Sequence, residues 1–358
     1  MIEHREYQVR LINDAMKAFD DGCKNVLIVS PCGSGKTLVS LQLLRQMQQK
    51  RKLRIGWVAM RHKLLQQAEL ENQRVGVKDI TFLSMFEKHP PKCDVMVCDE
   101  GHHDSATSCA LLHKRMKVEI SLGLSGTPFR TDRVKLAFDK IISDYGVRFL
   151  IEKGYLCNFD QYVVPEFSPK VVADRLISEP ERWGKSVVYM PTEAACQETD
   201  ALLKRRGVAS ETIFGWHSHQ QRDEIFTRFE QGQTQVLINI YLLSEGFDCP
   251  DLRSVFVRDA NKLCTIQMSG RSLRKDPSDP TKTANIIQSE KAPFPYTRVT
   301  KARQQWHWLN SWHSVSHNER AEAAVKQALK MIATTKVTLP EYLLKKRAKD
   351  LRNSVLDP

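Results

Sequence analysis

Three short stretches of the sequence carry residue types that are suited to phosphate chemistry. Residues 31–37 read Pro-Cys-Gly-Ser-Gly-Lys-Thr, residues 99–102 read Asp-Glu-Gly-His, and residues 267–274 read Gln-Met-Ser-Gly-Arg-Ser-Leu-Arg. A glycine-rich turn that ends in Lys-Thr can fold its backbone N–H groups around a phosphate. Neighbouring carboxylates can hold Mg²⁺ and polarise water, and arginines can stabilise charge on a transferred phosphoryl group. The three stretches together indicate a nucleotide hydrolase.

The first stretch lies between an apolar run and a helical pattern, which is the context that a phosphate loop requires. Val26–Val29 is typical of a buried strand, and leucines recur at helical spacing after the loop. We expect Lys36 to neutralise the β- and γ-phosphates of ATP and the Thr37 hydroxyl to ligate Mg²⁺. The strict form of the pattern has glycine where this chain has Ser30, so a glycine-rich turn without a ligand is the alternative. The other residues expected to bind the nucleotide here are Gly33, Ser34 and Gly35.

Asp99 and Glu100 directly follow a second apolar run, Val95–Cys98. They are therefore expected at the carboxyl edge of a sheet, where ligands bind in α/β folds. There Asp99 would hold Mg²⁺ through its water shell, and Glu100 would polarise the attacking water. An isolated Asp-Glu pair is usually two solvated carboxylates at a strand end, but the phosphate loop ahead of this pair favours the catalytic interpretation.

Arg271 and Arg274 are three residues apart, so on a helix they share a face. Arginines directed at the γ-phosphate stabilise charge in the transition state. Alone, the Gly-Arg-x-x-Arg pattern is typical of a solvated basic helix. Its position after the phosphate loop and the acidic pair instead predicts that a second domain completes the site.

Short apolar runs alternate with helical stretches in two successive sets. The runs are 26–29, 55–59, 80–83, 95–98 and 120–124 in the first set, and 186–190, 212–214, 236–240, 254–257 and 284–287 in the second. Such alternation predicts an α/β fold whose parallel sheets are covered by helices on both faces. Gly146 and Gly154 interrupt the pattern, so we place the domains at 1–150 and 151–290, followed by a basic extension over 291–358.

Residues 300–358 show no further strand alternation and are predicted to be mostly helical. Trp308 and Trp312 would share a helical face, and with Trp306 they either pack on the second domain or stack on nucleic-acid bases. We favour packing, because aromatic residues at helical spacing are usually buried. Basic residues outnumber acidic ones by 14 to 6 over residues 281–358. This excess favours a polyanionic partner, and a solubilising helical face is the alternative.

The composition is that of a soluble globular protein, with 41% hydrophobic and 27% charged residues and a net charge of +12. No stretch is apolar enough for a membrane span, and the polar first residues do not resemble a signal peptide. The nine cysteines occur singly, without a Cys-x-x-Cys pair. This pattern favours reduced thiols in a cytoplasmic protein over disulfides or a zinc site.

In their order and spacing these motifs resemble those of the superfamily 2 DExH-type helicases and translocases, near the branch that includes UvsW, XPB and the type III restriction motor subunits. The resemblance covers residues 4–290. The stretches similar to family motifs are 7–8, 31–37, 58–66, 81–84, 99–103, 124–130, 187–190, 244–250 and 267–274. The resemblance implies two tandem RecA-like domains that use ATP and Mg²⁺ to move along nucleic acid.

The resemblance also implies roles for individual residues. Gln8 is similar to a glutamine that reads adenine, with Arg5 beside it, and Gly246 and Asp248 lie in a motif that contacts the nucleotide. The residues implied to couple hydrolysis to domain motion are His102, Ser125, Thr127 and Gln267. The residues implied to contact a nucleic-acid strand are Arg61, Ser84, Arg130, Asn239 and Ser244.

Three functions remain compatible with the sequence: a DNA motor, an RNA motor, and a motor subunit or ATP-gated clamp that works with a partner nuclease. Asp-Glu-Gly-His in place of Asp-Glu-Ala-Asp, and the lack of a recognisable RNA module, favour DNA. The chain carries no nuclease motif, so cutting would need a second protein. It begins almost at the glutamine motif and has no large inserted domain, which favours translocation over unwinding. We expect a monomer.

Overall fold

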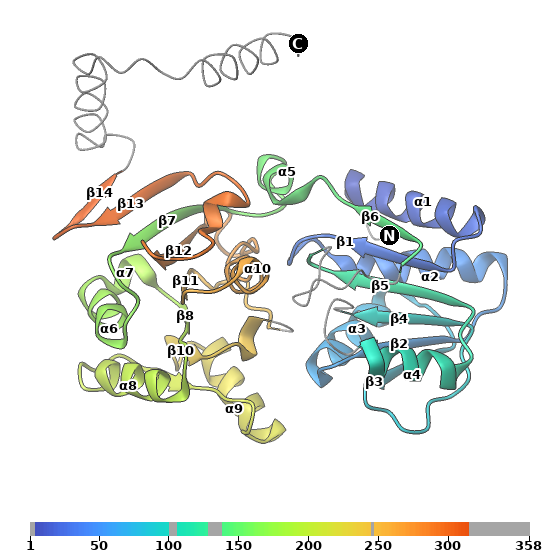
Figure 1. The fold of residues 1–358 in the computed structure, drawn as a ribbon, viewed down its shortest axis with the longest axis horizontal. Helices are drawn as coiled ribbons and strands as arrows, with labels where there is room; N and C mark the ends of the chain where they lie inside the picture. Colours follow the sequence, from blue (N-terminus) through green and yellow to red (C-terminus); the bar gives the residue numbers. More distant parts are fainter. Residues whose placement is uncertain (1–3, 100–105, 128–137, 245–246, 315–358) are drawn as a thin grey trace, which may run out of the picture. The chain divides into compact units, whose positions relative to one another are not determined.

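The computed structural model describes residues 4–99, 106–127, 138–244 and 247–314. Two sheets organise these residues, the first parallel throughout and the second mostly parallel, and their strands up to β13 belong to one compact unit, Met1–Trp312. We call the first sheet with its helices the N-terminal lobe and the second sheet with its helices the C-terminal lobe (Figure 1). The prediction of two successive α/β sheets is therefore confirmed.

The sheet of the N-terminal lobe has six parallel strands in the order β3-β2-β4-β5-β1-β6. The strands are β1 (Asn25–Val29), β2 (Ile55–Ala59), β3 (Ile80–Ser84), β4 (Val95–Asp99), β5 (Ile120–Ser125) and β6 (Lys140–Ser143). Five of them coincide with the predicted apolar runs. Only β6 lies outside those runs, because it is short and mostly exposed.

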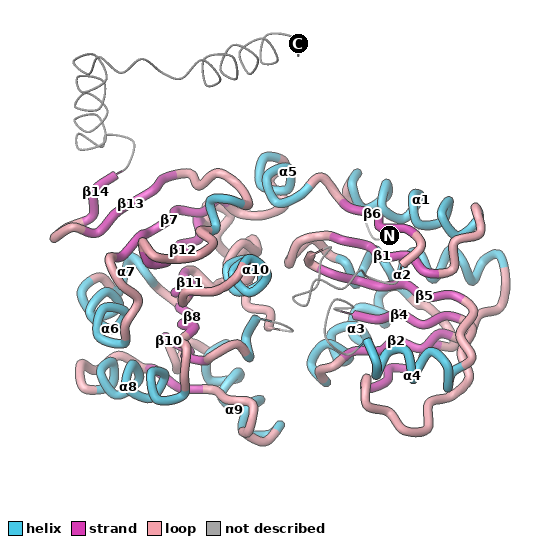
Figure 2. Tube along the Cα trace, in the orientation of Figure 1, coloured by secondary structure: helices cyan, strands magenta, loops and turns pink. Residues whose placement is uncertain are grey.

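Helices cover both faces of this sheet, as the alternation along each strand requires. Trp57 and Val97 belong to the core cluster that also contains side chains of α1, α2 and α3. The neighbouring residues Val58 and Cys98 point to the other face and pack with Leu112 of α4. The helices are α1 (Glu6–Asp20), α2 (Lys36–Lys50), α3 (His62–Val75), α4 (Ala106–Met116) and α5 (Gly146–Glu152), the last of which precedes the C-terminal lobe (Figure 2).

The sheet of the C-terminal lobe has the strand order β14-β13-β7-β12-β11-β8-β10-β9. Its strands are β7 (Asn158–Val164), β8 (Ser186–Tyr189), β9 (Ser210–Thr212), β10 (Val236–Asn239), β11 (Ser254–Val257), β12 (Thr283–Ser289), β13 (Gln304–Trp308) and β14 (Trp312–Ser314). The pairs from β13 through β7, β12, β11, β8 and β10 to β9 are parallel.

Two groups of helices flank this second sheet. Val188 packs with side chains of α6 and α8, whereas its neighbour Val187 belongs to the cluster that contains Phe229 of α9. The helices are α6 (Pro169–Ser178), α7 (Pro180–Trp183), α8 (Glu193–Lys204), α9 (His219–Glu230) and α10 (Lys262–Gly270), with short 3₁₀ turns at Leu242–Ser244 and Tyr296–Arg298.

The prediction that the tail is mostly helical is wrong for residues 304–314, which form β13 and β14. Trp306 and Trp308 are two residues apart, which is the spacing of one strand face. The expected packing is confirmed: the Trp306 ring stacks on Tyr162 at 6.4 Å, and the rings of Trp308 and Trp312 lie 5.1 Å apart. Residues 315–358 lie outside the described part of the chain.

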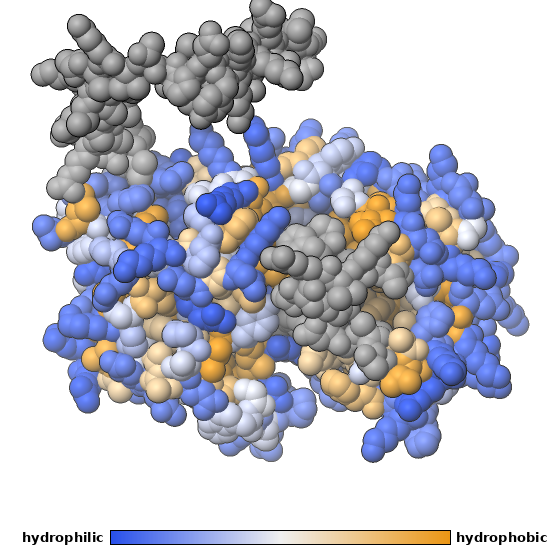
Figure 3. All heavy atoms as spheres, viewed as in Figure 1, coloured by the Kyte–Doolittle hydropathy of each residue, from blue (hydrophilic) through white to orange (hydrophobic). Residues whose placement is uncertain are grey.

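Hydrophilic residues cover most of the described surface on the face viewed in Figure 3, and apolar residues form small separate patches. Among the helices of the described residues, none is both long and apolar enough to span a membrane. Nine large apolar side chains are exposed among the described residues, and Met60 and Phe86 are two of them.

Candidate nucleotide and nucleic-acid sites

The phosphate loop and the acidic motif emerge at one edge of the N-terminal sheet. Strand β5 lies between β1 and β4, with Val29 opposite Ser125 and Asp99 opposite Leu124. The carboxyl ends of these three strands are thus aligned, and ligands of α/β sheets bind at such an edge. Glu100 directly follows Asp99 but lies outside the described residues.

The loop that follows β1 has the backbone of a phosphate cradle. Gly33 and Gly35 have φ angles of 81° and 83°, which a side chain would disfavour, and Gly35 is the residue from which α2 begins. The Lys36 ammonium donates to the backbone oxygens of Ser30 at 3.1 Å and of Pro31 at 3.4 Å. The Lys36 side chain therefore folds back over the loop that would hold the phosphates.

A buried polar atom in this loop lacks a partner within the described structure. The Ser34 hydroxyl is inaccessible to solvent and makes no hydrogen bond to any described residue. Because buried polar atoms are normally hydrogen-bonded, an unsatisfied hydroxyl in a phosphate cradle fits a ligand rich in acceptor oxygens. The loop thus fits a nucleotide phosphate by its backbone and by its side chains.

Helix α1 braces the same loop from outside. The Tyr7 hydroxyl and the Gln8 amide nitrogen both donate to the backbone oxygen of Ser34, the latter at 3.0 Å. Burial raises the pKa of Tyr7, so its hydroxyl keeps the proton that it donates. The side-chain oxygen of Gln8 accepts from the Arg5 backbone at 3.1 Å. Gln8 is thus a brace for the loop, and adenine recognition by Gln8 and Arg5 stays a prediction.

Ser30, where the strict motif has glycine, ties the loop to the edge of the sheet. Its hydroxyl donates to the carboxylate of Asp144, which directly follows β6. Burial raises the pKa of Asp144, and the backbone N–H of Gly146 donates to the same carboxylate at 2.7 Å. Ser30, which replaces the glycine of the strict motif, therefore donates a hydrogen bond to the buried carboxylate of Asp144.

The turn after β5 is held by its own side chain. The Ser125 hydroxyl donates to the backbone oxygen of Thr127 at 2.5 Å and accepts from its N–H at 3.0 Å. The Thr127 hydroxyl is buried and has no hydrogen-bond partner among the described residues, a second unsatisfied group near this edge. His102 and Arg130 lie outside the described residues.

The two arginines of the arginine block contact the segment that precedes β11. Arg271 donates from Nε to the backbone oxygen of Ser244 at 2.7 Å and from Nη1 to that of Phe247 at 3.2 Å. Arg274 forms an ion pair with Asp248, whose second carboxylate oxygen is buried without a partner in the described structure. Both arginines are therefore positioned by the 244–248 segment. Within it, Gly246 lies outside the described residues.

Gln267 is buried in α10, and its side-chain oxygen accepts from the Tyr241 hydroxyl. Helix α10 begins at an Asn261 cap, whose side chain accepts from the backbone of Cys264 at 3.0 Å. The glutamine is thus linked to the turn that follows β10. That link is compatible with a coupling role, which stays a prediction.

The arginine block also lies against the phosphate loop. A Cβ placed on Gly33 would be 2.9 Å from Cγ of Arg274 and 3.2 Å from Cδ2 of Leu156. A Cβ on Gly270 would be 3.6 Å from Cβ of Cys32. Residues of the two motifs are therefore in van der Waals contact, although more than 230 positions separate them in the sequence.

Two of the predicted strand-contacting residues, Arg61 and Ser84, line a cavity of about 680 Å³. The Arg61 guanidinium donates to the backbone oxygen of Leu242. We call this the Phe86 cavity. Its lining residues are Met60, Arg61, His62, Lys63, Gln66, Ser84, Phe86, His219, Arg222, Asp223, Phe226 and Leu242.

Asn239 and Ser244 are not in this cavity. Both are fully buried, and the Asn239 amide donates to Val188 at 3.2 Å and accepts from the Leu243 N–H at 3.2 Å. The Ser244 hydroxyl donates to the backbone oxygen of Tyr241 at 2.6 Å. These two side chains therefore support the turn after β10, and their contact with a nucleic-acid strand stays a prediction.

Helix α9 also brings His219 and Arg222 into the cavity, and neither residue was predicted from the sequence. The available signal was a capping box: Ser218 and Gln221 exchange side-chain to backbone hydrogen bonds at 3.2 and 2.8 Å and fix where α9 begins. A helix that starts at His219 carries Arg222 on the same side, one turn further on.

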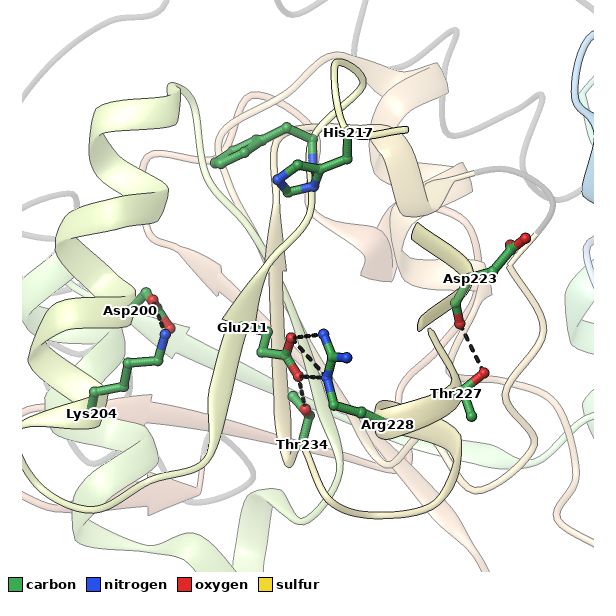
Figure 4. Close-up of polar contacts among 9 residues, drawn as sticks. Asp200, Lys204, Glu211, His217, Asp223, Thr227, Arg228 and Thr234 are labelled. Carbon is green, nitrogen blue, oxygen red and sulfur yellow. Dashed lines mark hydrogen bonds and ion pairs between the residues drawn. The ribbon is translucent and has the colours of Figure 1, made fainter. Parts of the chain in front are cut away.

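Helix α9 is anchored to β9 by a charged network (Figure 4). Arg228 donates to the Glu211 carboxylate at 2.9 and 2.6 Å, and the Thr234 hydroxyl donates to the same carboxylate. The hydrogen bonds from Arg228 lower the pKa of Glu211. In the loop before the helix, His217 Nδ1 accepts from the Phe214 N–H at 3.2 Å. The network fixes the helix that presents Arg222 to the cavity.

Comparison with known families agrees with this geometry. The family described as the type III restriction enzyme res subunit matches residues 1–90, and the family described as the helicase conserved C-terminal domain matches residues 169–276. The two matches together cover more than half of the chain and include both the phosphate loop and the arginine block. The chain belongs to the superfamily 2 helicases and translocases.

Individual relatives are distant. A Saccharomyces cerevisiae protein named as an ATP-dependent helicase is 22% identical over 338 residues, which cover 75% of this chain and 49% of the relative. The chain spans about half to two thirds of the length of the first curated relatives that it matches.

Solved structures share the fold of this superfamily 2 chain. A type ISP restriction-modification enzyme bound to DNA matches with a TM-score of 0.60 and 14% identity, covering 80% of this chain and 28% of that one. Saccharomyces cerevisiae Dbp5, bound to RNA and ADP BeF3, matches with a TM-score of 0.58 and 14% identity, covering 80% of this chain and 87% of that one. The tandem RecA-like architecture is thereby confirmed.

Proposed function

We propose that this protein is a nucleic-acid-stimulated ATPase that couples hydrolysis of Mg²⁺-bound ATP to movement along DNA. The observation that carries the proposal is the contact between Arg274 and Gly33, because it joins the arginine block of one lobe to the phosphate loop of the other. A site built from two lobes makes the distance between them depend on the bound nucleotide, which is what a motor requires.

The residues at this junction suit the binding of a nucleotide phosphate with Mg²⁺. Lys36 and the unsatisfied Ser34 hydroxyl would hold phosphate oxygens, while Thr37 and Asp99 would hold Mg²⁺. Mg²⁺-ATP supplies the phosphoryl group whose transfer to water releases free energy. Arg274 would neutralise charge that develops on that group, and Glu100 would orient the attacking water.

The roles carried over from the superfamily stay part of this proposal. Arg271 and Gln267 would relay the state of the nucleotide to the turn after β10, to which both are hydrogen-bonded. His102, Ser125 and Thr127 would do the same for the N-terminal lobe. The two lobes would then open and close with the state of the nucleotide, and this motion would act on a strand in the Phe86 cavity.

DNA is the proposed polymer because the acidic motif reads Asp-Glu-Gly-His. A net charge of +12 suits either polymer. The test is ATP hydrolysis with duplex, branched and single-stranded DNA and with RNA, all at one salt concentration. We expect DNA to stimulate turnover and Lys36→Ala to abolish the stimulated rate. Stronger stimulation by RNA would reverse the choice of polymer, and turnover retained by Lys36→Ala would remove the phosphate-loop assignment.

A second function, a motor subunit that works with a nuclease, is favoured by one observation. The family that matches residues 1–90 is described as a subunit of a restriction enzyme. Purification from the native source would then yield a stoichiometric nuclease partner. Recovery of the chain alone, with full DNA-stimulated turnover, would favour the independent motor.

A further inference from the structure

Two large apolar side chains are exposed inside the Phe86 cavity. The Phe86 residue is 61% exposed and Met60 is 45% exposed. Single exposed apolar residues are common on proteins, but a pair that shares one cavity marks a contact surface. No aromatic ring among the described residues packs against Phe86, and 61% of the residue is accessible to solvent.

The Phe86 ring is presented by a turn with a fixed backbone. The backbone N–H of Phe86 donates to the Ser84 hydroxyl at 3.3 Å, and that of Glu87 donates to the Ser84 backbone oxygen at 3.0 Å. The backbone N–H of His89 donates to the Glu87 carboxylate at 3.0 Å. These hydrogen bonds fix the backbone that carries the Phe86 ring, so little backbone entropy is lost when the ring contacts a ligand.

Cationic side chains line the same cavity. Lys63 lies 3.5 Å from the Glu230 carboxylate and 4.0 Å from the centre of the Phe226 ring. Arg222 has a buried Nε that lacks a hydrogen-bond partner within the described structure. An unsatisfied guanidinium donor and an exposed aromatic ring that line one cavity match a ligand that carries an anionic backbone and flat apolar faces.

We propose that Phe86, supported by Met60, stacks on an unpaired nucleobase, while Arg222 contacts the phosphates of the same strand. This inference rests on the proposed action on nucleic acid and narrows it to a single strand in the cavity. The faces of bases within a duplex are covered by neighbouring pairs, and exposing one costs a few kcal/mol. A single strand offers its faces at much lower cost, so stacking at Phe86 selects for unpaired DNA.

The test compares two fluorescently labelled single strands of equal length on the full-length protein. One is oligothymidylate, and the other has the same phosphates with abasic sugars, so only the bases differ. We expect the wild-type protein to bind the base-bearing strand about 10-fold more tightly, as loss of a stacking contact predicts. Phe86→Ala should remove this preference and leave binding of the abasic strand unchanged. Phe86→Trp should keep it.

Leu70→Ala is the matched control, because Leu70 is also 61% exposed but lies on α3 outside the cavity lining. It should retain the full preference for bases. Equal binding of the two strands by the wild-type protein, or a preference that survives in Phe86→Ala, would overturn the stacking site. ATP hydrolysis measured in parallel separates the two proposals: DNA-stimulated turnover without a base preference refutes only the stacking site, and no stimulation by any nucleic acid refutes the motor.

Discussion

The backbone of Gly33 passes so close to Arg274 that a single added methyl group would lie 2.9 Å from the Cγ of the arginine. The glycine belongs to the phosphate loop and the arginine to the last motif of the C-terminal lobe. Glycine is thus required at position 33 for two independent reasons: its positive φ angle of 81° and the approach of the other lobe.

Gly33→Ala separates these two reasons when it is compared with Gly207→Ala. Gly207 has a φ angle of 74°, but a methyl group added there would have no neighbouring atom within 4 Å. Both variants should lose about 1–2 kcal/mol of stability, the cost of a left-handed backbone with a side chain, as measured by denaturant unfolding. Only Gly33→Ala should also lose DNA-stimulated ATP hydrolysis, by about 100-fold, because it displaces Arg274. Equal activity in the two variants would show that the contact does not matter for turnover.

Arg274→Ala tests the charge that this arginine would bring to the phosphate. The arginine now neutralises Asp248, and a phosphate would compete with that carboxylate for it. We expect kcat to fall by about 10³-fold, with a much smaller change in the dissociation constant for ATP. Arg206→Ala, which removes an exposed arginine beyond α8, is the control and should be active. A change in ATP affinity alone would argue that Arg274 binds the ground state only.

The sequence predicted the buried parts of the fold well, because strands covered on both faces are nearly continuous apolar runs. It did not predict β7, whose centre is polar. Asp160 and Gln161 are buried there, and Asp160 is paired with Arg303 at 2.9 and 2.7 Å. That partner lies 143 residues further along the chain, so no local pattern could show that a polar segment would be buried.

In the candidate site, too, the local features could be predicted from the sequence and the long-range contacts could not. The phosphate loop and the acidic pair could be predicted, because each follows its own strand directly and needs only local context. The partners of Ser30 and Arg271 could not, since they depend on which distant segments the fold brings together. Asn239 shows a further limit: the resemblance implies that it contacts a nucleic-acid strand, but it does not show that the fold buries the side chain completely.

Glu211→Gln tests how α9 is held against β9. The charge-assisted hydrogen bonds from Arg228 would weaken, and we expect a loss of about 1 kcal/mol at neutral pH, since Arg228 is partly exposed. Because the pKa of Glu211 is lowered in the folded state, its contribution is complete above the unfolded pKa and is lost as the pH falls. The difference in melting temperature from wild type should thus be largest at pH 7 and narrow below about pH 4.3.

Glu224→Gln is the control for that experiment, because it removes an exposed carboxylate from the same helix. Its melting temperature should stay near that of the wild type across the same range of pH. A Glu211→Gln deficit that is constant with pH would mean that the loss comes from packing and not from the ionised carboxylate.

Lys282→Met tests a residue that lies outside both the 244–250 motif and the arginine block at 267–274. Its ammonium is buried and donates to the backbone oxygens of Pro250 at 2.5 Å and of Arg274 at 2.8 Å. Lys282 therefore links the end of the 244–250 motif to the end of the arginine block. Burial lowers the pKa of Lys282, but both the charged and the neutral amine can donate to these carbonyls. Methionine keeps the length of the side chain and removes the donors, which should cost about 1–3 kcal/mol of stability.

Lys282→Met should also slow ATP hydrolysis, because an Arg274 that is held less firmly would stabilise the transition state less. We expect kcat of the DNA-stimulated reaction to fall about 10-fold while the KM for ATP changes little, and Lys282→Arg to restore part of the rate. Lys291→Met, at an exposed lysine beyond β12, should behave as the wild type. If Lys282→Met is destabilised but retains its kcat at a temperature where it is fully folded, the lysine supports the fold alone. A fall in kcat that arginine rescues would identify it as a positioning residue for Arg274.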